Sequence, residues 1–132
     1  MPKQINSRGF SLIELMIVIG IIAILTSIAY PSYIDSVRKS RRATAQADLL
    51  ELANFMERRF TETNAYPLLD SDLPFEASPR TGTLYYALDL DASSSISSFT
   101  LQATPSGSQT ADSCGTLTLS QTGAQTPTTN CW

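Results

Sequence analysis

The sequence predicts an α+β fold in which one long N-terminal α-helix packs on a small antiparallel β-sheet. Three observations predict it: an apolar run fills residues 10–31, an amphipathic helical pattern continues over residues 32–60, and β-rich runs separated by turns follow within residues 61–132. The whole chain has 132 residues. Once a membrane-length segment is set aside, the remainder has room for one small domain and not for a large enzyme with a deep cleft.

The apolar run from Phe10 to Tyr30 carries a single charged side chain, Glu14. As a helix it is long enough to span about 30 Å of hydrocarbon, and a soluble helix of this length is rarely apolar on every face. Gly20 and Pro31 would weaken a soluble helix, but both residue types are tolerated in or beside membrane helices. We therefore expect Pro31 to kink the helix rather than end it.

The helical pattern resumes after Pro31 as an apolar stripe about 140° wide, an ordinary width for a face that packs on a core. The stripe consists of Ile34, Val37, Ala45, Leu49, Leu52, Met56 and Phe60. Because Arg38 and Arg41 interrupt it, we expect docking over residues 44–60 and a more solvated neck over residues 35–42. A weaker apolar line on the opposite side has no assigned role and consists of Ala43, Ala47 and Leu50.

The helix is expected to stop near Asn64, a residue that suits a helix end, because Pro67 forbids continuation. Residues 67–83 are rich in proline and read as an irregular loop. Three β-rich runs follow at residues 84–90, 96–104 and 115–122. They predict an antiparallel meander of about three strands, and the amphipathic helix is the obvious cover for one face of it.

Two cysteines, Cys114 and Cys131, could be free core thiols, part of a metal site or a disulfide. The chain has no histidine and no further cysteine, so a structural zinc site would be short of ligands. A disulfide needs an oxidising compartment. We favour the disulfide on condition that this part of the chain is exported.

Charge is distributed unevenly along the chain. A basic run, "RKSRR", occupies residues 38–42, whereas after residue 60 the single base Arg80 faces seven acidic side chains. A phosphate-binding surface on the C-terminal half would lack counter-charges. We therefore expect no nucleic-acid binding by that half, unless the run from Arg38 to Arg42 is exposed.

No enzyme chemistry is assigned to this sequence. Histidine is absent, no Gly-rich phosphate loop is present, and the usual pairs of nucleophile and base are missing. Two acidic pairs, Asp70 with Asp72 and Asp89 with Asp91, could offer oxygen ligands to calcium. Neither pair has the glycine and glutamate spacing of a calcium loop, so we assign no metal, no cofactor and no catalytic residue.

Two ordinary interpretations of the N-terminus remain open at this point. A secretory signal could be cut before Tyr30, at the small residues Ser27 and Ala29. However, its apolar region would exceed the usual length of about 7 to 15 residues, and Glu14 is an unlikely member of it. A plain membrane anchor explains the length of the run but not its charge.

The segment "SRGFSLIELMIVIGIIAIL" resembles the leader and first helix of type IV prepilins. This class III signal is shared by type IV pilins and type II secretion pseudopilins. The resemblance implies that residues 1–9, with the bases Lys3 and Arg8, are a leader that stays in the cytoplasm. It also implies that a membrane-embedded prepilin peptidase cleaves between Gly9 and Phe10 and N-methylates the new amino-terminal Phe10.

The prepilin resemblance gives Glu14 a role in assembly. Cleavage creates an amine at Phe10, four residues before Glu14, so the two charges would share a helix face. A buried carboxylate persists when it is paired. In the family, this glutamate is thought to meet the amine of a neighbouring subunit. Pairing within one chain and pairing between two chains both stay open.

The resemblance extends along the chain to a whole type IV pilin, and the tail is most similar to that of PilE-type minor pilins. It implies a Cys114–Cys131 loop and a pilus subunit, expected to be a minor one, in fibres used for adhesion, twitching motility and DNA uptake. Partners would be other pilin subunits, prepilin peptidase, and the inner membrane with its pilus assembly machinery. Alternatives are a major type IV pilin, a type II secretion pseudopilin and a DNA-binding pilin.

The expected location is the inner membrane of a Gram-negative bacterium, with the head in the periplasm before assembly and in the extracellular pilus afterwards. The positive-inside rule points the other way, because more bases follow the apolar run than precede it. We give precedence to the cysteine pair, which requires oxidation, and to the prepilin resemblance.

Overall fold

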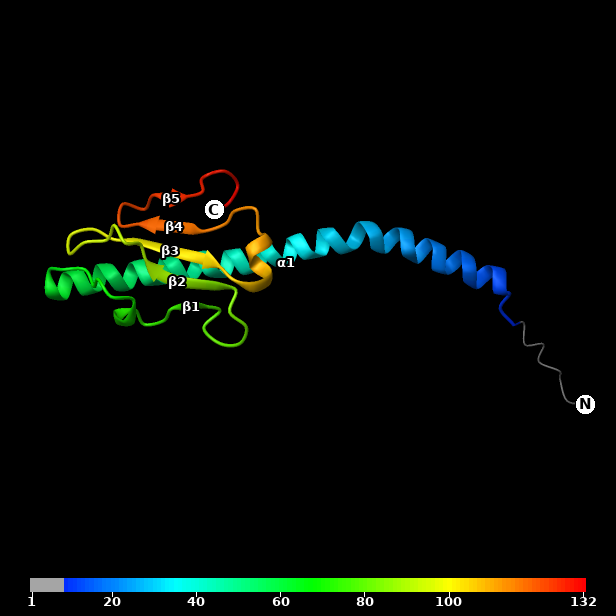
Figure 1. Cartoon of the computed structure of the whole chain (residues 1–132), viewed down its shortest axis with the longest axis horizontal. Helices are drawn as coiled ribbons and strands as arrows, with labels where there is room; N and C mark the ends of the chain where they lie inside the picture. The colour runs from blue at the N-terminus through cyan, green and yellow to red at the C-terminus, as the bar shows by residue number, and fades with distance from the viewer. Residues whose placement is uncertain (1–8) are drawn as a thin grey trace, which may run out of the picture. The chain divides into compact units, whose positions relative to one another are not determined.

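A computed structural model describes residues 9–132, which fall into two compact units, one ending at Ser36 and one comprising Val37–Trp132 (Figure 1). The second unit is called the head below. Of the leader expected over residues 1–9, all but Gly9 lies outside the described residues, including Lys3 and Arg8.

Helix α1 (Leu12–Thr63) contains the whole apolar run after Ser11 and all of the amphipathic pattern. Its first turn forms where the backbone N–H groups of Glu14 and Leu15 donate to Ser11 O, at 3.1 and 3.3 Å. Glu14 in this first turn complements the positive end of the helix dipole. The helix continues through Pro31, and the kink predicted there stays a prediction.

The predicted end of the helix is confirmed. Asn64 adopts a left-handed conformation, with φ of 59°, and its N–H donates to Phe60 O at 2.7 Å. Asparagine tolerates this conformation better than most residues other than glycine, so it serves as a helix C-cap.

The head contains a five-stranded antiparallel sheet in the order β1-β2-β3-β4-β5 (Figure 1). Its strands are β1 (Ala77–Ser78), β2 (Tyr86–Leu90), β3 (Thr100–Pro105), β4 (Leu117–Ser120) and β5 (Gln125–Thr126). The predicted meander is confirmed for β2, β3 and β4. The two-residue edge strands were missed, and the expected loop over 67–83 holds β1 and the short 3-10 helix η1 (Asp70–Asp72).

The core of the head lies between α1 and one face of the sheet. Along β3 and β4, buried residues alternate with more exposed ones, as a half-covered sheet requires. The register sets Leu101 opposite Leu119 and Ala103 opposite Leu117. From α1 the fully buried apolar side chains are Ala45, Leu49, Leu52 and Met56, the centre of the predicted stripe.

Aromatic side chains close the core at the end of α1. The rings of Phe60 and Tyr66 stack with centroids 4.5 Å apart, and Phe99 meets Tyr66 edge-on at 4.9 Å. The Tyr66 hydroxyl donates to Glu57 Oε1 at 3.0 Å, while the Tyr66 N–H donates to Ile96 O at 3.0 Å. The chain leaving the helix is thereby tied to the loop between β2 and β3.

Candidate functional site

The residues expected to be processed lie at the start of the described chain. Gly9 and Phe10 precede α1, and the Phe10 side chain is 79% exposed. Glu14 is exposed on the first turn of the helix. Because α1 begins two residues after Phe10, the shared helix face expected for Phe10 and Glu14 stays a prediction for the cleaved chain.

The apolar run of the first unit, up to Tyr30, is uncovered on every side. The residues from Leu12 to Ile28 are all exposed, and α1 is long and apolar enough to cross a membrane. Two hydroxyl groups of the apolar run bond within the helix itself, since Thr26 donates to Ile22 O at 2.5 Å and Ser27 donates to Ile24 O at 2.7 Å. Internal satisfaction of polar groups is what a lipid environment demands.

The prediction of a solvated neck over residues 35–42 is wrong at its last residue, Arg42. Arg42 is only 9% exposed, and its Nη1 lies 2.6 Å from Asp112 Oδ1. A buried arginine is stable when its charge is paired with good geometry, which this contact provides. Contacts between α1 and the rest of the head therefore begin before residue 44, at Arg42 and, through Arg38 O and the Arg41 side chain, earlier still.

Asp112 is the centre of a buried polar network. Its Oδ2 accepts hydrogen bonds from the Tyr86 hydroxyl and from Gln109 Nε2, both at 3.0 Å, and its Oδ1 also accepts the Cys114 N–H at 3.2 Å. Gln109 also donates to Arg38 O at 3.0 Å. Burial raises the pKa of the Tyr86 phenol to about 12, and the Asp112 carboxylate adds to this shift. The network joins α1, β2 and the 3-10 helix η2 (Gly107–Ala111).

The disulfide between Cys114 and Cys131 is present, and both of its cysteines are buried. It encloses β4 and β5. The Cys131 carbonyl accepts a hydrogen bond from Gln46 Nε2 of α1. The final segment is thus fixed to the helix as well as to the sheet.

Two arginines connect α1 to the loop between β1 and β2. The Arg41 guanidinium lies 3.7 Å from the centroid of the Tyr85 ring, and its Nη1 donates to Ser108 Oγ at 3.1 Å. From the loop, Arg80 pairs with Glu51 and lies 3.3 Å from Asp48 Oδ1. One arginine therefore reaches from the helix to the loop and the other from the loop to the helix.

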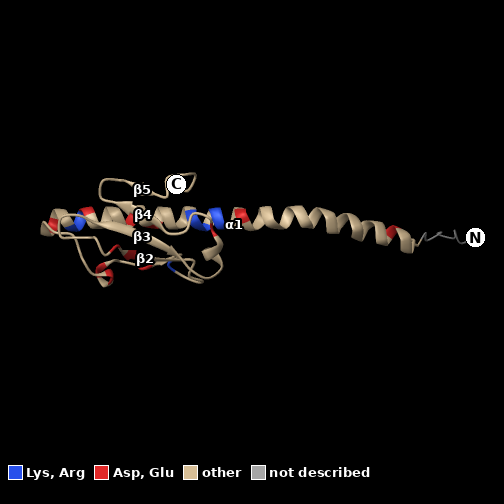
Figure 2. Cartoon of the chain, turned by 45° about the horizontal axis from the view of Figure 1, so that its top comes forward, with Lys and Arg blue, Asp and Glu red and all other residues tan. Residues whose placement is uncertain are grey.

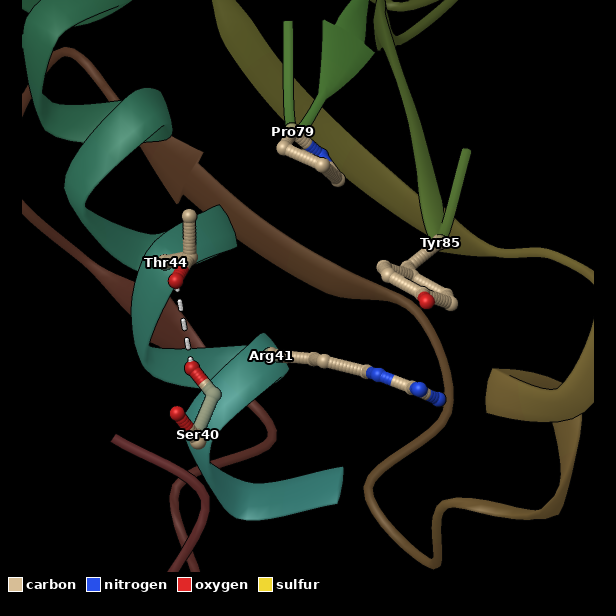
Figure 3. A pocket seen from close by; sticks show the side chains of 5 residues that line it. All are labelled: Ser40, Arg41, Thr44, Pro79 and Tyr85. Atoms are coloured by element: carbon tan, nitrogen blue, oxygen red, sulfur yellow. Dashed lines mark hydrogen bonds between the residues drawn. The ribbon is translucent and has the colours of Figure 1, made fainter. Parts of the chain in front are cut away.

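A pocket of about 150 Å³ opens beside the Arg41 contact (Figure 3). Figure 3 shows Arg41 extending below Tyr85, with Pro79 above and Thr44 on the helix opposite. The lining consists of Ser40, Arg41, Thr44, Pro79 and Tyr85, none of which is acidic.

The acidic pairs considered as calcium ligands belong to no group of three or more potential metal ligands among residues 9–132. Asp70 Oδ1 instead accepts the Leu90 N–H at 2.8 Å, and Asp91 Oδ1 accepts the Ser93 N–H at 2.9 Å. Asp89 is half-buried, with its Oδ1 lacking a hydrogen-bond partner, and burial raises the pKa of its carboxyl. It is thus less solvated than a strand-edge acid.

Charges separate along the head (Figure 2). Bases gather on α1 over residues 38–42, where Lys39 is exposed and Arg41 is half-buried. Acids gather at the end of the head where α1 and β2 both end, among them Glu62, Asp70 and Asp72. Arg58 and Arg59 also lie at this second end, but Arg59 pairs with Glu62 at 3.3 Å.

Sequence reasoning missed the network around Asp112, and one usable signal was present. Arg42 precedes Phe60 by eighteen residues, which is five full helical turns, so both residues point in the same direction. A base on the edge of a core-facing stripe needs a buried acid. The sequence does not show which of the ten acids downstream of Arg42 supplies it.

Comparison with known proteins identifies the class of this chain. Residues 31–118 match the family model described as "Type IV minor pilin ComP, DNA uptake sequence receptor", and residues 5–30 match the prokaryotic N-terminal methylation motif. A solved type IV pilin from Shewanella oneidensis is 30% identical, with a TM-score of 0.56, over 72% of this chain and 97% of that one. The chain belongs to the type IV pilin family, with a methylation motif followed by a ComP-like domain.

Other relatives include both pilus and secretion proteins. The chain is 37% identical to the type IV major pilin protein PilA of Myxococcus xanthus, over 61% of this chain and 36% of that protein. It is 32% identical to the type II secretion system core protein G of Pectobacterium carotovorum, over 52% of this chain and 44% of that protein. The chain thus spans less than half of these relatives. The minor pilin PilV of Neisseria meningitidis shares the fold, at 22% identity and a TM-score of 0.51, over 69% of this chain and 86% of that one.

Proposed function

We propose that this chain is a minor subunit of a type IV pilus, cleaved by prepilin peptidase between Gly9 and Phe10, N-methylated at Phe10, and assembled into the fibre. The observation that supports this most is the uncovered apolar stretch of α1 beside a compact head with its own core. An apolar surface of this size is unfavourable in water. Lipid covers it before assembly, and helices of neighbouring subunits cover it afterwards.

Glu14 is useful chiefly after assembly. At the centre of a bilayer a charged side chain costs roughly 2.5 to 3.5 kcal/mol even on the mildest scale, and an unpaired carboxylate nearer the end of the helix is still unfavourable. The amine that cleavage creates at Phe10 offers it a partner, within one chain or between two. Glu14 is therefore proposed as the residue that couples processing to assembly.

Substitution of Glu14 tests this role. Glu14→Val should be inserted and cleaved normally but should be missing from fibres sheared off cells. Glu76→Val is the matched control, since Glu76 is an exposed glutamate of the head. Incorporation of Glu14→Val at the level of the control would contradict the assembly role.

The head is proposed to face the periplasm of a Gram-negative cell before assembly and the exterior afterwards. The disulfide supports this orientation, because such bonds persist in oxidising compartments. Alkaline phosphatase fused after residue 60 should then be active. An inactive fusion that is still expressed would show that the basic run at 38–42 keeps the head in the cytoplasm.

A receptor for DNA is the second candidate function, favoured by the ComP-like match over residues 31–118. The charges offer it limited support. Lys39 is exposed, but Arg41 is engaged with Tyr85 and Ser108, and Arg42 is buried against Asp112. The full chain in detergent should bind duplex DNA more weakly as salt rises from about 50 to 200 mM, and Lys39→Glu should weaken it further. Binding unaffected by Lys39→Glu would place any DNA site elsewhere.

A pseudopilin of type II secretion is the remaining alternative, since the secretion proteins named core protein G are also relatives. A role in the type IV pilus and a role in type II secretion predict different phenotypes. Loss of the chain would leave pili intact and abolish secretion of exoproteins if it is a pseudopilin. A trace amount in sheared pili supports a minor pilin, and a dominant amount supports a major one.

A further inference from the structure

We propose that the pocket beside Arg41 binds an acidic sugar, that is, one pyranose ring carrying a carboxylate. The walls of the pocket come from α1 and from the loop between β1 and β2, and all of its residues belong to the head (Figure 3). An exported head would meet such sugars in cell-surface polysaccharides. The binding itself goes beyond the proposed function and does not depend on assembly of the chain into a fibre.

The pocket has the size of one small ring. Its volume of about 150 Å³ is similar to that of a cavity that holds benzene. Two of its residues, Ser40 and Thr44, are exposed, so the pocket is open to solvent. A ring at the end of a glycan can therefore enter it while the rest of the glycan stays in water.

The walls of the pocket combine ring surfaces with hydroxyl groups, as a sugar requires. Pro79 and Tyr85 supply the ring surfaces, and the negative face of an aromatic ring suits C–H groups. Ser40 and Thr44 supply hydroxyls from α1. Thr44 Oγ1 donates to Ser40 O at 3.2 Å, which leaves its lone pairs to accept an O–H from a ligand.

Two buried polar atoms next to the lining residues have no hydrogen-bond partner in the described chain. They are Asp48 Oδ2, one helical turn after Thr44, and Ser78 Oγ, directly before Pro79. Asp48 is 9% exposed and Ser78 is 1% exposed. Because unpaired buried polar atoms are unfavourable, a hydroxylated occupant, with the water it retains, is favoured here over a hydrocarbon.

Arg41 selects a negatively charged ligand. Its guanidinium lies 3.7 Å from the centroid of the Tyr85 ring, and its Nη1 donates to Ser108 Oγ at 3.1 Å. These contacts hold the group in place but use few of its five N–H donors. No acid lines the pocket. A carboxylate can therefore accept two parallel hydrogen bonds from the planar guanidinium.

One available cation favours a sugar acid over a nucleic acid. Binding to DNA depends on several Lys and Arg side chains that follow successive phosphates. Next to Arg41, however, Arg42 is buried against Asp112. Arg80, on the loop, is paired with Asp48 and Glu51, so it also offsets the charge of Asp48 beside the pocket. The pocket thus offers the charge that a single carboxylate needs.

Titration of the full chain in detergent, followed by the NMR signals of its backbone amides, tests the site. The probes are D-glucuronate, D-glucose, which lacks the carboxylate, and benzoate, which lacks the hydroxyls. D-glucuronate should bind with a Kd on the order of 1 mM, at least about fivefold tighter than the other two. Signals of Thr44 and Tyr85 should shift, and that of Thr122, between β4 and β5, should not. Equal binding of D-glucose or benzoate, or no binding of D-glucuronate at about 50 mM, would overturn the proposal.

Substitution of Arg41 tests the source of the selectivity. Arg41→Met should weaken binding of D-glucuronate at least about fivefold and leave the weaker binding of D-glucose unchanged. Arg41→Lys should recover only part of the loss, because an ammonium group lacks the planar fork. The matched control is Arg59→Met, since Arg59 is also on α1 but pairs with Glu62 outside the pocket. Binding of D-glucuronate by both Arg41 variants at the level of this control would contradict the proposal.

Competition with a short DNA duplex separates the sugar from a nucleic acid. The duplex should not displace D-glucuronate from the pocket. Displacement that Arg41→Met abolishes would assign the pocket to nucleic acid and refute the sugar site. Because these measurements use the purified chain, their failure leaves the proposed role in the pilus intact, whereas absence of the chain from sheared fibres would contradict that role alone.

Discussion

Arg42 Nη1 lies 2.6 Å from Asp112 Oδ1, and this buried pair fixes α1 to the segment that leads into the disulfide loop. Arg42→Met should lower the free energy of unfolding of the head by about 3–5 kcal/mol, because it leaves the Asp112 carboxylate buried without its counter-charge. Urea unfolding of the full chain in detergent, followed by the fluorescence of Trp132, measures the change. Arg41→Met is the matched control and should cost about 1 kcal/mol or less, since Arg41 is partly exposed.

A cost for Arg42→Met no larger than that of Arg41→Met would contradict a structural role for the buried pair. The comparison is informative because the two arginines are adjacent in sequence and on the same helix. Because both variants replace arginine with methionine in α1, intrinsic helix propensity cancels between them. The remaining difference in cost reflects the burial and the partner of each arginine.

The raised pKa of Tyr86 predicts that the folded head loses stability at alkaline pH. Its folded-state pKa is raised to about 12 by burial and by Asp112, above the unfolded value of about 10. The contribution is therefore fully present below pH of about 10 and is lost as pH rises through about 12, a change of roughly 2–3 kcal/mol. Tyr86→Phe should remove this part of the pH dependence while also lowering stability at neutral pH.

The measurement is unfolding free energy against pH, for the native chain and for Tyr86→Phe. Their difference should shrink between pH values of about 10 and 12. A difference in unfolding free energy that stays constant over this range would show that the pKa of Tyr86 is not raised in the folded state.

The disulfide should contribute strongly to so small a core. It joins residues 17 positions apart, and closing a loop of this length stabilises a fold by about 3 kcal/mol in the chain-entropy account. The double variant Cys114→Ser, Cys131→Ser should unfold at correspondingly lower urea concentration. A loss below about 1 kcal/mol would mean that the contact of Gln46 with the Cys131 carbonyl and the sheet already hold the loop.

Sequence patterns predicted the parts of this fold that depend on local regularity. The stripe through Leu49, Leu52 and Met56 identified the buried face of α1, and Asn64 marked its end. The three longer strands were found because each alternates over several residues. β1 and β5, with two residues each, carry no such period and form only because a neighbouring strand is present.

The sites that could not be predicted depend on contacts distant in sequence. Arg42 and Asp112 are 70 positions apart, and Arg80 reaches Asp48 across 32. A charge pattern shows that such residues need partners but not which partners the fold supplies. The pocket beside Arg41 has the same origin, since its walls come from α1 and from the loop between β1 and β2.

The central claim, that this chain is processed and assembled as a pilus subunit, is tested most directly by its N-terminus in the fibre. Fibres sheared from cells would be analysed by mass spectrometry for the first peptide of this chain. The account predicts a chain that begins at Phe10 with a methylated amine. A chain in the fibre that retains residues 1–9, one that begins near Tyr30 after cleavage as an ordinary secretory signal, or its absence from intact fibres would contradict it.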